Sequence, residues 1–134
     1  MADYTIANLK TDVEDQAPGF GLAPNLEARF ARQNLALEQS GASYEKLAPG
    51  FRVPFGHTHT RQEEVYVVIS GSGRMKVGDE MVELKPFDAV RVAAGVWRGT
   101  EAGPDGLEVI VFGARCGMSP GDNDAEMEQG WWSD

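Results

Sequence analysis

The sequence predicts an all-β protein built as an antiparallel sandwich or small barrel. From about Tyr44 onward, short runs of β-forming residues alternate with turn residues at near-regular spacing. This spacing is typical of all-β folds and differs from the longer period of alternating β–α units. The chain has 134 residues, which is enough for one domain with a single buried core.

Composition narrows the class of partner. An apolar share of 42% and a charged share of 25% are typical of a soluble globular chain. The net charge of −9 would be repelled by phosphate backbones and by anionic membranes, so we expect neither as a partner. We also expect no signal peptide and no membrane helix, because no basic or long apolar run has the required pattern. Cys116 is the single cysteine, which rules out an intrachain disulfide and fits a cytoplasmic protein with Cys116 at least half-buried.

The first half of the chain gives the weaker signals. Residues 4–9 read as a strand, and residues 15–24 are rich in turn formers. Residues 25–37 are either an edge strand followed by a turn or a short capped helix, and we favour a strand around residues 28–31. Residues 43–50, SYEKLAPG, predict a strand that ends at its Pro-Gly pair.

The second half reads as a series of strands. Residues 64–70, EVYVVIS, form a strong strand signal that we expect to stop at the glycines of residues 71–73. Residues 74–84 predict a hairpin that turns at Gly78-Asp79, because apolar and charged residues alternate on both sides. The remaining strands and turns are, in order, strand 89–92, turn 94–95, strand 97–101, turn 103–106 and strand 107–113.

Two segments flank the predicted core of residues 44–113. Residues 1–43 form an N-terminal arm, and residues 114–134 form an acidic C-terminal tail. A polar chain end is normally frayed, but this tail ends in Trp131 and Trp132. We expect the two tryptophans to dock back and cover an exposed core edge, in preference to forming a lid over a ligand.

The strongest strand is apolar on both faces. Val65, Val67 and Ile69 lie on one face, and Tyr66 and Val68 lie on the other. Such a strand needs cover on both sides. One face packs on the interior of the domain. The other face must pack against a second subunit, the N-terminal arm or the C-terminal tail. A homodimer is the favoured assembly, with a self-covering monomer as the alternative.

The candidate functional residues are His57, His59 and Glu64. Residues i and i+2 of an extended segment point to the same side, so both imidazoles can converge on one ion. Glu64 begins the next strand and can present its carboxylate from a neighbouring position. Two histidines and one carboxylate suit Fe, Mn, Zn, Ni or Cu. A His-x-His pair alone is weak evidence for a metal site. The longer sequence string around the pair is stronger evidence.

That string resembles the first motif of the cupin superfamily. The motif runs H-x-H, three or four residues, E, six residues, G. Here His57 and His59 are followed by four residues, Glu64, six residues and Gly71. Glu63 fits the shorter spacing, but counting back from Gly71 selects Glu64. The resemblance covers roughly residues 44–113. It implies an antiparallel double-sheet β-barrel, the cupin jelly roll, that is often dimeric and holds its metal ligands at the barrel mouth.

The second cupin motif is eroded in this chain. Phe87 stands where the family has a glycine, residues 93–95 replace P-x-G, and Arg98 stands where the family has its last histidine ligand. A guanidinium has no lone pair to give a metal. In one alternative, Arg98 binds an anionic group of a substrate beside a three-ligand ion. In another, Arg98 pairs with Glu64 and leaves a metal-free pocket for an organic anion. Arg98 could also point outward.

Two function classes stay open. In the enzyme hypothesis, a dioxygenase- or isomerase-like cupin uses its divalent ion on a small anionic substrate, with Tyr66 and also Trp97 shaping the pocket. In the binding hypothesis, a sensing or carrier cupin holds a small molecule without turnover. A purely structural role is the third alternative. The residues leave the catalytic groups undefined, because both histidines belong to the expected metal shell. A fold with so many functions must be argued from its site.

Overall fold

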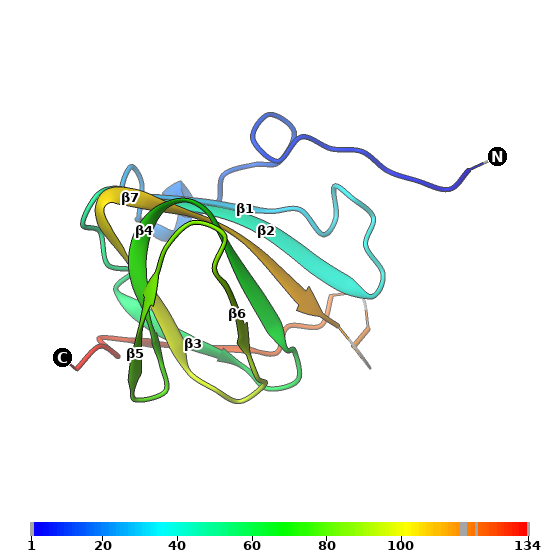
Figure 1. Cartoon of the computed structure of the whole chain (residues 1–134). Helices are drawn as coiled ribbons and strands as arrows, with labels where there is room; N and C mark the ends of the chain where they lie inside the picture. Colours follow the sequence, from blue (N-terminus) through cyan, green and yellow to red (C-terminus); the bar gives the residue numbers. More distant parts are fainter. Residues whose placement is uncertain (1, 116–117, 120, 134) are drawn as a thin grey trace.

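The computed structural model describes residues 2–115, 118–119 and 121–133, and its fold is all-β, as predicted (Figure 1). Its helical content in these ranges is one short 3-10 helix, η1 (Ala17–Phe20), and no described helix has the length and apolarity needed to cross a membrane. Cys116 lies outside the described residues. The strands are β1 (Leu26–Phe30), β2 (Ser40–Leu47), β3 (Phe55–His59), β4 (Glu64–Val77), β5 (Glu80–Leu84), β6 (Ala89–Val92), β7 (Arg98–Ala114) and β8 (Ala125–Gln129).

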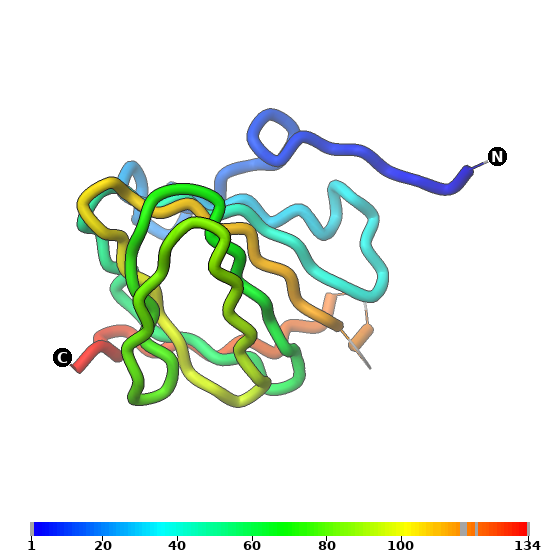
Figure 2. The backbone as a smooth tube through the Cα atoms, in the orientation of Figure 1, coloured from blue at the N-terminus to red at the C-terminus, as the bar shows by residue number. Residues whose placement is uncertain are grey.

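All strand pairings are antiparallel, and the two long strands β4 and β7 hold the sheet together. They pair along almost their whole length, from Glu64 opposite Gly113 to Val77 opposite Arg98. β7 also pairs with β2 and β3, while β4 pairs with β5 and β6. β1 adds to β2, and β8 adds to β3. Because both long strands bend, the sheet curls into a half-barrel (Figure 2).

Two glycine-rich stretches that were predicted as turns, residues 71–73 and 103–106, lie inside β4 and β7. β4 continues to Val77, with register shifts that mark β-bulges. A Cβ at Gly71 would lie 2.1 Å from the carbonyl oxygen of Gly106. Glycine is therefore required by the close approach of two backbones and not by chain reversal. Both turn predictions are wrong for this reason, whereas the hairpin between β4 and β5 is confirmed.

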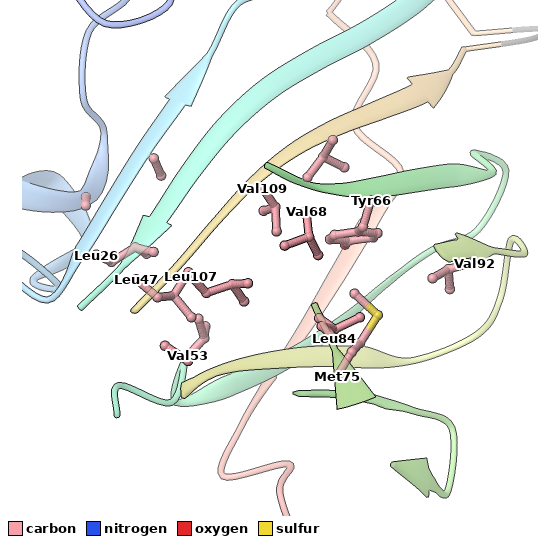
Figure 3. Packing of buried hydrophobic residues seen from close by; sticks show 14 residues of the cluster. Leu26, Leu47, Val53, Tyr66, Val68, Met75, Leu84, Val92, Leu107 and Val109 are labelled. Carbon is pink, nitrogen blue, oxygen red and sulfur yellow. The ribbon is translucent and has the colours of Figure 1, made fainter. Parts of the chain in front are cut away.

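The core lies on the concave side of the curled sheet. Tyr66 and Val68 of β4 are buried there, while Ile69 on the opposite face is 43% exposed. This outer apolar face keeps the homodimer as a prediction, which a measurement of mass by sedimentation would decide. Figure 3 shows the core side chains pointing into the enclosed space; those labelled are Leu26, Leu47, Val53, Tyr66, Val68, Met75, Leu84, Val92, Leu107 and Val109.

The N-terminal arm differs from its prediction at one point. Residues 4–9 are not a strand. Tyr4 and Ile6 are 78% and 86% exposed, so their apolar side chains find no buried surface that would hold this segment against the sheet. The strand favoured at residues 28–31 is confirmed as β1, which extends the sheet beyond the predicted core.

The C-terminal tail docks on the domain, as predicted, and adds a strand that the sequence did not indicate. β8 pairs with β3 in register, with His57 opposite Met127. Trp131 then packs on Gly56, on the face of β3 opposite to the histidines. Trp132 donates a hydrogen bond of 2.8 Å from its indole nitrogen to the carbonyl oxygen of Val53. The tryptophans therefore cover the outside of β3.

The packing of Trp131 on Gly56 gives the first testable prediction. A Cβ at Gly56 would lie 2.3 Å from Cδ2 of Trp131, so Gly56→Ala should displace the indole and destabilise the fold by roughly 1–3 kcal/mol. Thermal unfolding and tryptophan fluorescence measure the two effects. Gly19→Ala is the matched control, because a Cβ there meets nothing within 4 Å. A Gly56→Ala variant with native stability and fluorescence would contradict the packing.

Candidate metal centre and cavity

His57, His59 and Glu64 converge, as their spacing predicts. One ligand atom from each lies within 4.8 Å of the others. Nε2 of His59 is 3.4 Å from Oε2 of Glu64, and Nε2 of His57 is 3.8 Å from Oε1 of the same carboxylate. β3 supplies both imidazoles on one face, and the first residue of β4 supplies the carboxylate. Whether the group binds an ion stays a prediction.

A fourth residue, Asp124, fixes the orientation of His59. Its Oδ1 lies 2.8 Å from Nδ1 of His59 and accepts a hydrogen bond from Nε2 of Gln62. Its Oδ2 accepts the backbone N–H groups of Arg61 and Gln62. Burial opposes ionisation, but these hydrogen bonds outweigh it and hold the pKa of Asp124 well below its usual range. An ionised Asp124 accepts a hydrogen bond from the Nδ1–H group of His59. The lone pair of His59 is then on Nε2, the atom that faces Glu64.

Tyr66 lies next to the same group and lines the main cavity, and its role in ligand binding stays a prediction. Its hydroxyl donates to Oε1 of Glu64 at 3.1 Å and lies 3.5 Å from Nε2 of His57. Burial and the Glu64 charge raise the pKa of Tyr66, so the hydroxyl remains a donor. Burial, with the help of Arg98, lowers the pKa of His57 although Glu64 opposes the shift. Neutral imidazole is the form that binds metals.

Trp97 was expected to help shape the pocket. It stacks on Trp131, with ring centroids 6.5 Å apart, and does not line the main cavity.

Arg98 is fully buried behind Glu64. Its NH1 donates to the carbonyl oxygen of Val96 at 3.0 Å, and its NH2 lies 3.4 Å from Oε1 of Glu64. The guanidinium borders a small inner cavity and not the larger one described next. Of the three alternatives for Arg98, the outward orientation is excluded. The position favours the ion pair with Glu64, and binding of a ligand anion by Arg98 stays a prediction.

The candidate ligand group opens into a cavity of about 310 Å³. This volume falls at the lower end of the range for small-molecule sites. Apolar side chains supply much of its wall, and charged or polar side chains stand among them. The wall includes Phe20, Phe30, Phe55, Val111 and Met127 beside the three candidate ligands and Tyr66. The geometry therefore combines a metal-ligand set with room for a small molecule.

Glu45 is a titratable group on the cavity wall that sequence reasoning missed. It lies on β2 and lines both the main cavity and the small inner one. Burial, reinforced by the charge of Glu64, raises the pKa of Glu45 to about 7. The signal in the sequence was its i+2 spacing to Leu47, which points inward. Glu45 is thus a protonatable group on the cavity wall that lies outside the candidate ligand set.

The fold and site define a small antiparallel β-barrel with a His/His/carboxylate group at its mouth. The family model for the cupin domain matches residues 43–113, more than half of the chain. The chain therefore belongs to the cupin family.

Solved structures agree with this assignment. A cupin protein from Bacteroides fragilis is 25% identical, with a TM-score of 0.70 over 92% of this chain and 93% of that one. KdgF from Halomonas sp. is 22% identical, with a TM-score of 0.62 over 87% and 97%. Oxalate decarboxylase from Bacillus subtilis is 20% identical, with a TM-score of 0.69 over 93% of this chain but 32% of that one. The last two share the fold. Curated protein sequences give no match.

The raised pKa of Glu45 predicts a pH dependence of stability. Between the ordinary value of 4.5 and about 7, the folded state holds more protons at Glu45 than the unfolded state does. The free energy of unfolding should therefore fall as pH rises through this window. Glu45→Gln cannot ionise at this position. The free energy of unfolding of the variant minus that of wild type should therefore rise by roughly 2–3 kcal/mol from pH 5 to pH 8. Denaturant titrations of metal-free protein at each pH measure this, and parallel profiles for the two proteins would contradict it.

Proposed function

We propose that this cupin binds one divalent first-row ion (Fe, Mn, Zn, Ni or Cu) through His57, His59 and Glu64. The observation that carries the proposal is the convergence of the three ligand atoms within 4.8 Å on the cavity wall. The donor set fits such an ion, because two imidazoles and a carboxylate are ligands that these metals prefer. Three protein ligands leave open positions for a small molecule from the cavity.

We further propose that the site acts on a small organic anion. A bound divalent ion would supply Lewis-acid or oxygen chemistry at its open positions. The chain supplies the remaining functions: the hydroxyl of Tyr66 orients the carboxylate of Glu64, and Glu45 exchanges protons with the cavity. Dioxygenase- and isomerase-like reactions both use such parts. Which of these reactions applies depends on the substrate.

A second candidate function is metal-free binding of an organic anion, as in a sensor or carrier. The ion pair between Arg98 and Glu64, 3.4 Å long, favours it, because the guanidinium neutralises the carboxylate without a metal. The same ion pair also weakens the negative potential that attracts a cation. The metal content of the protein separates the two functions.

Metal content is therefore the decisive measurement for the proposed function. Wild-type protein, as purified and after reloading, should contain close to one equivalent of a first-row metal by elemental analysis. His57→Ala and Glu64→Gln should abolish the binding, because each removes one of three ligands. Glu63→Gln is the matched control, since this exposed neighbour pairs with Arg91 outside the cavity. Wild type that takes up none of the five metals would overturn the metal function and favour the metal-free one.

Asp124 provides a separate test of how the ligands are positioned. Asp124→Ala should weaken metal affinity about 10- to 100-fold, because His59 loses the carboxylate that fixes its ring. Asp124→Asn keeps an acceptor oxygen, so its metal affinity should fall between those of wild type and Asp124→Ala. Competition titrations give the affinities, and the visible spectrum of the Co²⁺ form reports the ligand geometry. Asp122→Ala, on the exposed part of the same segment, is the control. Equal affinities for the Asp122 and Asp124 variants would argue against this role.

A further inference from the structure

Two arginines, Arg32 and Arg115, line the cavity at a place that the metal proposal does not use. Arg32 follows the end of β1, and Arg115 follows the end of β7. Both ends flank the start of β2, because the backbone N–H of Ala31 donates to Ala42 and that of Arg115 donates to Gln39. The two side chains therefore follow the strands on either side of β2, and both line the cavity.

Both arginines have hydrogen-bond capacity that the described chain leaves unused. The Nε atoms of Arg32 and Arg115 are buried and have no partner among the described residues. Arg115 is held in place from its other side, because its NH2 donates to the carbonyl oxygens of Ser119 and Asp122 at 3.3 and 2.9 Å. Buried donors of this kind are rare in native proteins and call for a specific explanation.

The positive charges of Arg32 and Arg115 are not neutralised by a described carboxylate. The chain carries 21 acidic and 12 basic residues, so most cations have carboxylates at hand. Yet the described part of the chain places no carboxylate in an ion pair with Arg32 or Arg115. Two uncompensated guanidinium groups beside a cavity attract an anion, and each offers the forked donor geometry that matches a carboxylate.

Gly41 leaves space between the two arginines. It lines the cavity from the start of β2, and a Cβ added there would meet nothing within 4 Å. Ser43 lines the cavity two residues further along the same face. Phe30 lines the same cavity and gives it an apolar wall. This part of the cavity can therefore receive a charged group while the wall receives a hydrocarbon segment.

We propose that Arg32 and Arg115 form an anion subsite that binds one carboxylate of a small organic diacid. The second carboxylate of the diacid lies at His57, His59 and Glu64, and this second anchor rests on the proposed function. The hydrocarbon chain between the carboxylates runs along the apolar wall. The subsite thus selects dicarboxylates over monocarboxylates of the same length.

The test is calorimetric titration with two matched series of acids. Succinate, glutarate, adipate and pimelate are compared with the monocarboxylates of equal carbon number, on metal-loaded and on metal-free protein. At least one diacid should bind about tenfold or more tightly than its monoacid. Arg32→Ala and Arg115→Ala should each remove this preference, and on metal-loaded protein they should leave monoacid binding unchanged. Arg91→Ala, an arginine of β6 outside the cavity, should keep it.

A direct readout accompanies the titration. The Nε–Hε NMR signals of Arg32 and Arg115, assigned from the alanine variants, should shift with the preferred diacid and not with its monoacid. The subsite is overturned if no diacid in the series exceeds its monoacid, or if the preference survives both substitutions. The metal proposal fails separately. Protein that takes up no metal but prefers a diacid through Arg32 and Arg115 supports the subsite alone, and metal uptake without any preference removes the subsite alone.

Discussion

The site depends on the bending of β7 together with β4. β7 places Arg98 opposite His57 near its start and Gly113 opposite Glu64 near its end. Fifteen residues of straight strand would separate these two positions by about 50 Å. The ligand atoms instead lie within 4.8 Å of one another. Only strong curvature brings both ends of one strand to the same group, and the contact between the Gly71 and Gly106 backbones permits that curvature.

The charges around the candidate ligands bear on which molecule the proposed metal site would bind. With neutral imidazoles, the carboxylates of Glu64 and Asp124 and the guanidinium of Arg98 sum to one negative charge. A divalent ion would turn this sum to one positive charge in a partly buried setting, where charges are screened less than in water. Arg98 contributes to this balance although it does not line the main cavity. In the proposed site, an arginine in place of a ligand would thus change both the preferred charge of a bound molecule and the coordination number of the ion.

Local patterns allowed much of the fold and the three candidate ligands to be predicted. The His-x-His pair and the spacing to Glu64 are short-range signals, and so is the hairpin at Gly78-Asp79. Glycine was ambiguous, because the same residue permits a turn and a bulge, and only pairing between β4 and β7 decides which one forms. Asp124 could not be predicted, since it meets His59 from 65 residues away in a polar segment with no strand signal. Contacts of this range are fixed by tertiary packing alone.

The segment that carries Asp124 also bears on what counts as the functional unit. The family match ends at residue 113, yet the carboxylate that orients His59 and the strand that covers β3 both come later in the chain. A fragment cut at the family boundary would contain all three candidate ligands and lack the group that aims one of them. During synthesis the ligands leave the ribosome before Asp124 does, since chains emerge from the N-terminus. The candidate site therefore cannot gain its full set of contacts until the C-terminal tail has been synthesised.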